Sequence, residues 1–545
     1  YVQTIGIGTR TIDSVQIIWP DNSYQTQANI SNNKLYEFSQ KDDSKSYEIN
    51  AENNITYLSE INKNTLEKHN ENNHTDFNYE GLIHQMLSQE GPTISVGDLN
   101  NDGLDDVFIG GAKTQKGKIY FQTQTGDLKL SNNNVFEIDK FLEDTASAMF
   151  DADNDGDLDL MVGTGGNEIE DEKKYKTRLY LNNGKGKFVK SESNIQTTFH
   201  NVSVIAPHDF DNDGDVDVFI GSRSVPAVYG INAKHQLLEN NGNGEFKDIT
   251  KNKAYTFKSL GMVTHAKWHD FDADGKKDLV LIEDCGSPKI FKSNGKQLVP
   301  YQTNLENYKG WWNAMEITDV NNDGLPDLIL GNNGLNVPYK PSIEKPIKIF
   351  VNDFDNNGTI EQVLTETING KDIPIITKHE LTAQIVSLKK KNLKFADYAT
   401  KSIQELFPEE VISQSIVREV NTSGSIVAIY TKENDFKIIE LPLEVQFSSV
   451  SAIKAVDINN DSNLDLLLGG NNFDFKPQYS RLDANYGSFL LGNGKGEFTW
   501  VDYGKSGFFV NGEVKNISSL KRKNDTLLIV GVNDSKPKLF KINNE

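Results

Sequence analysis

The chain has 545 residues, a net charge of -22 and an isoelectric point near 4.9. A surface this acidic argues against nucleic acid as a partner, because phosphates require a basic surface. The sequence has no run of eighteen apolar residues and predicts no membrane-spanning helix. The single cysteine, Cys285, cannot form an internal disulfide, and we interpret it as a small core residue.

Residues 1–46 predict a small antiparallel β-module. The stretch IDSVQIIWPDNSYQT, from Ile12, alternates apolar and polar residues on both sides of a Pro-Asp-Asn turn. Residues 47–90 are polar and rich in asparagine, and they predict a connector and docking arm. Residues 91–545 then carry a repeated acidic pattern, which predicts one large β-domain.

Seven short acidic loops recur along this domain. Each has oxygen-bearing side chains at positions 1, 3, 5 and 9, and six have glycine at position 6, as in DADNDGDLD from Asp151. Ca²⁺ takes six to eight oxygen ligands, and carboxylates this crowded either raise their pKa values or recruit a cation. An EF-hand needs Glu at position 12, where all seven loops have an aliphatic residue, so this is a different Ca²⁺ loop.

The loops predict about six or seven Ca²⁺ sites, with a backbone carbonyl at position 7 as a further ligand. The seventh loop has Ser462 at position 6, where a non-glycine residue at positive φ is costly. The predicted metal ligands are Asp98, Asn100, Asp102 and Asp106; Asp151, Asp153, Asp155 and Asp159; Asp209, Asp211, Asp213 and Asp217; Asp270, Asp272, Asp274 and Asp278; Asp319, Asn321, Asp323 and Asp327; Asp353, Asp355, Asn357 and Glu361; and Asp457, Asn459, Asp461 and Asp465.

Each loop except the one at Asp353 runs directly into a short apolar segment such as DVFIGG or DLLLGG, which reads as a buried strand. The first residues of successive loops are 53, 58, 61, 49, 34 and 104 residues apart. Periods near fifty to sixty, with Asn-Gly hairpins such as LYLNNGKGKF, predict an all-β, seven-bladed β-propeller. The seventh blade is the tail after about residue 514, which keeps the strand rhythm without the acidic ligands.

Two segments depart from the repeat. The loop at Asp353 follows IKIFVN, where other blades carry a hairpin, and we interpret it as a second kind of site inside the fifth blade. Residues 378–412 have apolar residues three and four apart, as at Leu381, Ile385 and Leu388, and predict a small helical insertion between blades.

These residues resemble the FG-GAP/VCBS-repeat proteins, whose integrin-like propellers carry Ca²⁺ in blade hairpins. The segment IDSVQIIWPDNSYQT resembles ASPIC/UnbV, and SQEGPTISVGDLNNDGLDDVFIGGA resembles the propeller that follows it in large bacterial members and in relatives of cartilage acidic protein. The resemblance implies a binding platform on a bacterial surface lipoprotein. Its partners would be outer-membrane proteins, such as a TonB-dependent importer complex, and a glycan or peptide ligand. The lipid anchor would lie upstream of Tyr1, in a longer precursor.

The leading functional hypothesis is therefore a non-enzymatic, calcium-stabilised extracellular binding or scaffold protein, an accessory subunit for nutrient import or assembly. The alternative is a propeller enzyme of the lyase, esterase or dehydratase type that acts on glycans. His265 and His269 alternate on one strand and could face the central channel, although packing is the favoured role. Trp311 and Trp312 could form a stacking platform, although core packing is again favoured.

Overall fold

The computed structural model describes residues 6, 8, 11–19, 23–40, 45–46, 56–62, 65–168, 174–192, 195, 198–432 and 435–543. The chain forms two compact units, Tyr1–Ile55 and Thr56–Glu545. The first unit contains an antiparallel sheet in the order β1 (Ser14–Ile18), β2 (Ser23–Ala28) and β3 (Lys45–Ser46). The predicted N-terminal β-module is confirmed, and the predicted Pro-Asp-Asn turn lies outside the described residues.

In the second unit, seven of the antiparallel sheets that the described residues form are here called sheets 1 to 7; sheet 4 has five strands and the others have four. Sheet 1 contains β5 (Ile94–Gly97), β6 (Asp106–Ile109), β7 (Lys118–Gln122) and β8 (Leu128–Leu130); sheet 2 contains β9 (Glu143–Phe150), β10 (Asp159–Gly165), β11 (Arg178–Leu181) and β12 (Val189–Lys190); and sheet 3 contains β13 (Asn201–His208), β14 (Asp217–Ser224), β15 (Gln236–Asn240) and β16 (Phe246–Asp248). Sheet 4 contains β17 (Met262–His269), β18 (Asp278–Gly286), β19 (Lys289–Ser293) and β20 (Leu298–Tyr301), with β21 (Gly310–Trp311) paired to β18; and sheet 5 contains β22 (Ala314–Thr318), β23 (Asp327–Gly331), β28 (Ile426–Tyr430) and β29 (Phe436–Glu440). Sheet 6 contains β30 (Val450–Val456), β31 (Asp465–Gly470), β32 (Ser488–Gly492) and β33 (Phe498–Val501); and sheet 7 contains β34 (Val514–Lys521), β35 (Thr526–Val532), β36 (Lys538–Ile542) and β4 (Leu58–Glu60).

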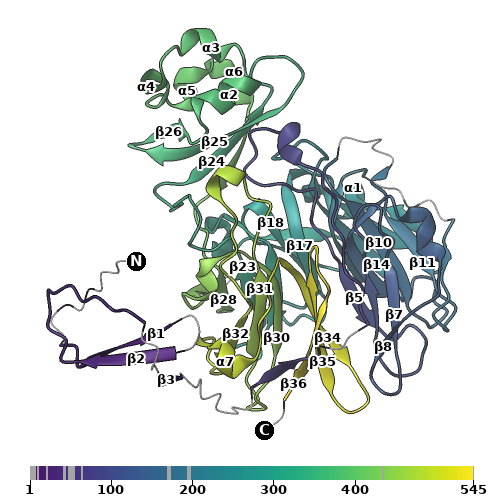
Figure 1. The fold of residues 1–545 in the computed structure, drawn as a ribbon. Coiled ribbons are helices and arrows are strands. Elements are labelled where there is room, and N and C mark those ends of the chain that lie inside the picture. The colour runs from purple at the N-terminus through teal and green to yellow at the C-terminus, as the bar shows by residue number, and fades with distance from the viewer. Residues whose placement is uncertain are drawn as a thin grey trace. The chain divides into compact units, whose positions relative to one another are not determined.

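The first strands of these sheets form a closed ring. Each contacts the next in the order β5, β9, β13, β17, β22, β30, β34, and β34 returns to β5. Hydroxyl groups link neighbours, since Thr145 Oγ1 donates to the Val202 carbonyl at 2.6 Å and Thr264 Oγ1 to the Trp312 carbonyl at 2.7 Å. All seven strands line one central cavity of about 740 Å³. The predicted all-β propeller is confirmed (Figure 1).

Sheet 7 is completed by a strand from the other end of the chain. β4 pairs with β36, with Phe540 opposite Glu60 and Ile542 opposite Leu58. Lys538 Nζ lies 2.9 Å from Glu60 Oε2, and the Leu58 side chain is fully buried in a cluster that contains Phe540. A segment that the sequence predicts as connector therefore closes the ring.

Replacing Leu58 tests this closure. We expect Leu58→Ala to lower the free energy of unfolding by about 2–5 kcal/mol, because the surrounding cluster cannot collapse fully onto the cavity. Chemical denaturation measures the change. Leu130→Ala is the matched control, since Leu130 lies exposed on the outer strand β8 and its loss should cost little. Equal losses in the two variants would contradict the closing role.

The prediction that the loop at Asp353 belongs to the fifth blade is wrong. Sheet 5 passes from β23 directly to β28, and the residues between them form a separate sheet in the order β26 (Lys371–Pro374), β25 (Glu361–Ile368), β24 (Ile347–Asn352) and β27 (Ile416–Val420). The loop at Asp353 joins β24 to β25. The insertion is thus larger than predicted and interrupts one blade, where we expected a helical segment between two blades.

The helices of the insertion lie where the apolar periodicity predicts them. They are α2 (Lys378–Gln384), α3 (Leu388–Lys391), α4 (Phe395–Tyr398), α5 (Ile403–Leu406) and α6 (Glu409–Gln414). Capping boxes at Thr377 with Glu380 and at Ser402 with Glu405 begin α2 and α5. The predicted apolar residues are all buried: Leu381, Ile385, Leu388, Tyr398, Ile403 and Leu406.

Short helical segments lie in some of the other connections. Two are α1 (Thr250–Lys253) and α7 (Tyr503–Ser506), and 3₁₀ turns lie at Asp76–Asn78, Val135–Asp139, Tyr255–Ser259, Asn304–Asn307, Val445–Phe447 and Pro477–Tyr479. The end of the predicted connector packs against the insertion, because Leu82, Ile83 and Leu87 join the hydrophobic cluster that contains Leu381.

His84 in this connector predicts a dependence of stability on pH. Its ring is buried among Tyr229, Trp311 and Phe475, and this burial lowers the pKa of His84 to about 4. The folded protein therefore binds fewer protons than the unfolded chain below pH 6.5, so stability falls as the pH drops toward 4. We expect His84→Gln to remove up to about 3 kcal/mol of this loss, measured by denaturation at several pH values in excess calcium. Parallel pH profiles for variant and parent would contradict it.

Candidate metal centres

Six of the seven acidic loops occupy equivalent places in their sheets. Six join the first strand of a sheet to the second, at 98–106, 151–159, 209–217, 270–278, 319–327 and 457–465, and the loop at 353–361 joins β24 to β25 in the insertion. Position 9 is in every case the first residue of the following strand. The predicted arrangement, an acidic turn leading into a buried strand, is confirmed.

The backbone of these loops explains the residues at positions 4 and 6. Both positions are left-handed in all seven loops, with φ between 57° and 63° at position 4 and between 69° and 98° at position 6. Six of the loops have Asn at position 4, which tolerates this conformation, and six have Gly at position 6. A Cβ on any of these six glycines would meet no atom within 4 Å, so backbone conformation and not space requires glycine.

Ser462 shows the cost of departing from this pattern. Its φ is 69°, where an L-residue is strained. We expect Ser462→Gly to raise the free energy of unfolding by about 1 kcal/mol. Thermal denaturation measures the change, and Ser462→Ala, which keeps the strain, should give no gain. Equal stability of the glycine and alanine variants would contradict the strain.

The carboxylate at position 1 holds the turn together. One of its oxygens accepts the N–H of position 6 in every loop, at 2.7–3.1 Å, for example Gly156 to Asp151. In five of the loops the other oxygen accepts the N–H of position 5 at 3.0–3.2 Å. In the loops at Asp151 and Asp209 the other oxygen is buried without a hydrogen-bond partner among the described residues. Position 1 therefore needs a carboxylate for the fold of the loop as well as for any bound ion.

The carboxylate at position 9 ties each loop to its sheet. Asp159 accepts the N–H of Ala152 in its own loop and that of Asn182 at the end of the third strand, both at 2.8 Å. The same pair of bonds recurs at Asp106, Asp217, Asp278, Asp327 and Asp465, and Glu361 accepts the N–H of Phe354. All seven are buried. We call this arrangement the position-9 clasp.

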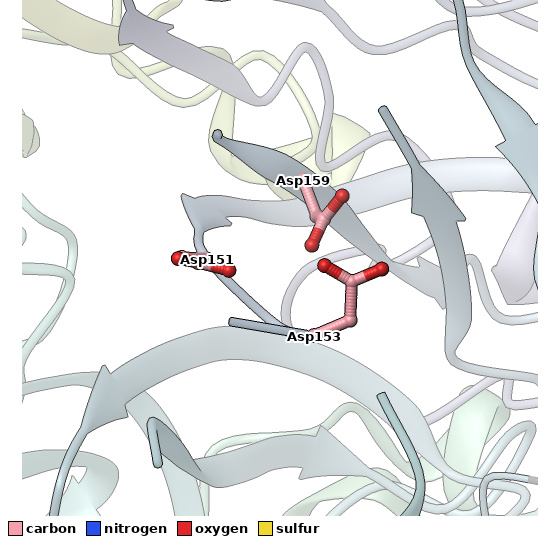
Figure 2. Close-up of side chains that lie close together, drawn as sticks. All are labelled: Asp151, Asp153 and Asp159. Carbon is pink, nitrogen blue, oxygen red and sulfur yellow. The ribbon is translucent and has the colours of Figure 1, made fainter. Parts of the chain in front are cut away.

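Four loops bring carboxylate oxygens within 4.8 Å of one another. Figure 2 shows the first, where Asp151, Asp153 and Asp159 face a common point. The others are Asp209, Asp211 and Asp217; Asp270, Asp272 and Asp274; and Asp353, Asp355 and Glu361. In the remaining three loops Asn stands at position 3, and in two of them its amide donates to the Asp at position 5 at 3.0 Å: Asn321 to Asp323 and Asn459 to Asp461.

Several of these oxygens are buried without a hydrogen-bond partner among the described residues. They are Oδ1 of Asp151, Asp153, Asp157, Asp209, Asp211 and Asp355. Burial and the neighbouring carboxylates raise the pKa of Asp157 to about 6, and burial raises the pKa of Asp159 to about 7. An all-oxygen donor set with unpaired oxygens fits Ca²⁺, because the ion would supply the missing partner for each oxygen.

The loops also differ from one another. In the loop at Asp270, Lys292 Nζ lies 2.6 Å from Asp272 Oδ2, so a lysine ammonium group lies beside a predicted metal ligand. The Asp157 side chain was not among the predicted ligands, since position 7 was assigned only a backbone carbonyl. The signal for it was the fourth Asp of DADNDGDLD. Asn154 Nδ2 also donates to Asp215 Oδ1 at 2.6 Å, which links two neighbouring loops.

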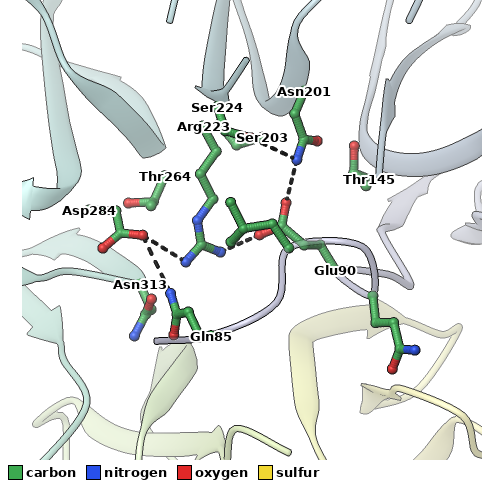
Figure 3. A network of polar contacts seen from close by, with 12 residues as sticks. Gln85, Glu90, Thr145, Asn201, Ser203, Arg223, Ser224, Thr264, Asp284 and Asn313 are labelled. Carbon is green, nitrogen blue, oxygen red and sulfur yellow. Dashed lines mark hydrogen bonds and ion pairs between the residues drawn. The ribbon is translucent and has the colours of Figure 1, made fainter. Parts of the chain in front are cut away.

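A charged network lies at the opposite ends of the strands from these loops. Figure 3 shows Arg223 between Glu90 and Asp284, with Nη2 of Arg223 3.1 Å from Asp284 Oδ2 and Nη1 paired to Glu90. Asn201 Nδ2 donates to Glu90 at 3.2 Å. Arg223 and Glu90 line the central cavity, so part of its wall consists of paired charges.

The structure also places the remaining candidate residues of the sequence analysis. The side chains of Trp311 and Trp312 are at most 1% exposed. This burial confirms core packing and leaves no stacking platform. Cys285 is buried, as predicted. His265 lines the central cavity, and burial lowers its pKa to about 3, so its ring is neutral. His269 lies outside the lining of that cavity, beside the loops at Asp270 and Asp319.

Known proteins match parts of the chain. The model of the FG-GAP-like repeat matches residues 98–162, 151–220 and 270–330, and that of ASPIC and UnbV matches residues 1–45. Integrin alpha-5 of Xenopus laevis is 28% identical over 174 residues, which cover 27% of this chain and 16% of the integrin. Among the described residues, every helix is too short or too polar to cross a bilayer.

Solved structures resemble the chain more distantly. The V. cholerae biofilm matrix protein Bap1 has a TM-score of 0.37 at 10% identity, over 85% of this chain and 89% of its own. The Dos1 propeller has a TM-score of 0.38 at 8% identity, over 85% and 95%. The ring of sheets, the loops and the two matched models agree: the chain is a β-propeller that carries FG-GAP-like repeats and an ASPIC/UnbV segment.

Proposed function

We propose that this protein is a calcium-stabilised extracellular binding or scaffold protein that serves as an accessory subunit of a bacterial outer-membrane complex. Ca²⁺ held in the acidic loops would neutralise crowded carboxylates and fix the ring of sheets. The ring would then display a rigid surface to a protein partner. In this proposal the protein binds its partner and catalyses no reaction.

One observation carries the calcium part of this proposal. Buried carboxylate oxygens without a hydrogen-bond partner among the described residues lie within the acidic clusters of the loops at Asp151 and Asp209, and Asp355 contributes one such oxygen to the cluster at Asp353. An unpaired buried charge is expensive, and a divalent cation is the partner that all-oxygen sites prefer. Millimolar Ca²⁺ is available outside the cytosol, which supports an extracellular location.

Calcium titration tests the sites directly. We expect the protein, freed of metal, to take up several Ca²⁺ ions by isothermal titration calorimetry, and the double variant Asp153→Asn, Asp211→Asn to take up fewer. Asp127→Asn is the matched control, because Asp127 is an exposed aspartate outside the loops. No calcium uptake, or the same loss in the control, would refute the calcium part.

The scaffold part needs a separate test. Purification of the tagged protein from native surface membranes should retain a stoichiometric protein partner in calcium and lose it in a chelator. The identity of the partner would distinguish an importer from an assembly complex. Absence of any partner in calcium would refute the scaffold role while leaving the metal sites intact.

A further inference from the structure

One segment of the insertion is basic, whereas the chain as a whole is acidic. Residues 386–395, VSLKKKNLKF, contain four lysines and no acidic residue, in a chain of net charge -22. Lys389, Lys390, Lys391 and Lys394 are all exposed, and none forms an ion pair with a described residue. Their charge therefore faces solvent without a partner in the described part of the fold.

The same ten residues expose three large apolar side chains. Val386 is 57% exposed, Leu393 80% and Phe395 65%. Single exposed apolar residues are common, but three of them among unpaired lysines form a surface that is both basic and apolar. This combination is typical of segments that lie at a membrane interface.

The exposure is built into the fold of the segment. Leu388, Asn392 and Tyr398 are buried and hold it to the insertion. Asn392 Nδ2 donates to the Leu388 carbonyl at 3.1 Å, Lys401 Nζ donates to Asn392 Oδ1 at 2.8 Å, and the Tyr398 hydroxyl donates to the Ile376 carbonyl at 2.8 Å. The exposed side chains between these anchors are therefore presented in fixed positions.

A fifth lysine contacts Leu393 and Phe395, the two exposed apolar residues that we call the tip. Lys378 Nζ donates to the Leu393 carbonyl at 2.9 Å and lies 4.7 Å from the centre of the Phe395 ring. Figure 1 shows α3 and α4 at the outer end of the insertion, on the side away from the ring of sheets. The tip is thus a projection of the second unit.

We propose that residues 386–395 dock on a bilayer that contains anionic lipids. The lysines would lie against the lipid phosphates, and Leu393 and Phe395 would enter the boundary between headgroups and acyl chains. A bilayer accepts projecting side chains without a preformed pocket, whereas a protein partner would need a complementary groove. A projecting tip therefore fits a bilayer better than a protein partner. This docking goes beyond the proposed scaffold role and does not depend on the metal loops.

Vesicle sedimentation at fixed calcium tests the proposal. We expect the full chain to bind vesicles of phosphatidylglycerol and phosphatidylcholine, to bind pure phosphatidylcholine far less, and to be released by salt. The triple variant Lys389→Gln, Lys390→Gln, Lys391→Gln should bind about 100-fold more weakly, at about fivefold per lysine. Leu393→Ser with Phe395→Ser should also weaken binding.

The matched controls change charge and apolarity elsewhere. Lys185→Gln, Lys187→Gln, Lys495→Gln removes the same charge from exposed hairpins of sheets 2 and 6, and Phe141→Ser with Val189→Ser removes exposed apolar groups. Both should bind like the parent. Equal losses in the test and control triples, or no binding to anionic vesicles, would overturn the proposal.

Two further readouts separate the bilayer from other occupants. Phe395→Trp should shift its fluorescence to the blue with anionic vesicles, which reports entry into the bilayer. Unchanged emission would overturn insertion, and release by inorganic phosphate at constant ionic strength would overturn the preference for lipid. Self-association without vesicles that the lysine triple abolishes would assign the surface to a second copy of this chain.

Discussion

Removing calcium should lower the melting temperature by roughly 10 °C. A site held at 100 times its dissociation constant contributes about 2.7 kcal/mol, and four loops bring carboxylates together, which gives about 10 kcal/mol. For a ring of nearly 500 residues, each kcal/mol shifts the melting temperature by about 1 °C. Calorimetry in excess calcium and in a calcium chelator measures the shift.

Magnesium supplies the control for this experiment. Mg²⁺ requires near-ideal octahedral geometry and gives up its water reluctantly, so it should restore less of the melting temperature than Ca²⁺ at equal concentration. If both ions restore it equally, screening of the net charge and not coordination would explain the effect. An unchanged melting temperature in the chelator would contradict calcium stabilisation altogether.

Asp159→Ala should cost about 4 kcal/mol even without calcium. The substitution leaves the N–H groups of Ala152 and Asn182 without their acceptor in a buried place, at about 1–3 kcal/mol each. Asp159→Asn retains one acceptor oxygen and should cost less. Chemical denaturation in a chelator measures both variants.

Asp153→Ala is the matched comparison for the position-9 clasp. Oδ1 of Asp153 is buried without a hydrogen-bond partner among the described residues, so its removal should lower stability only when calcium is present. In a chelator, Asp153→Ala should be at least as stable as the parent, because burial and the neighbouring carboxylates disfavour the charge of Asp153. Equal losses for Asp153→Ala and Asp159→Ala in a chelator would show that position 9 has no separate structural role.

The sequence predicted most of the repeated part of the fold. The loops were recognisable because every position has its own physical requirement: a carboxylate to cap the turn, residues that tolerate positive φ, and an acid that starts the next strand. The helices of the insertion were predictable because Leu381, Ile385 and Leu388 repeat at helical spacing and are all buried.

The parts that the sequence did not reveal depend on contacts between distant segments. β4 is only three residues long and has no pattern until β36 lies beside it. The insertion was misplaced because IKIFVN and QVLTET look like blade strands, and nothing local says that β23 pairs with β28 across them. The position-9 clasp was hidden because its second donor belongs to the third strand of the sheet.

The pairing of β4 with β36 also sets the order in which the molecule can be completed on the ribosome. β4 is translated about 480 residues before β36, its only described neighbour in the sheet. At 5–20 residues per second, this strand waits about 25–100 s for its partner. During that time the nascent chain keeps an unpaired strand edge, which is where chaperones or premature association would act.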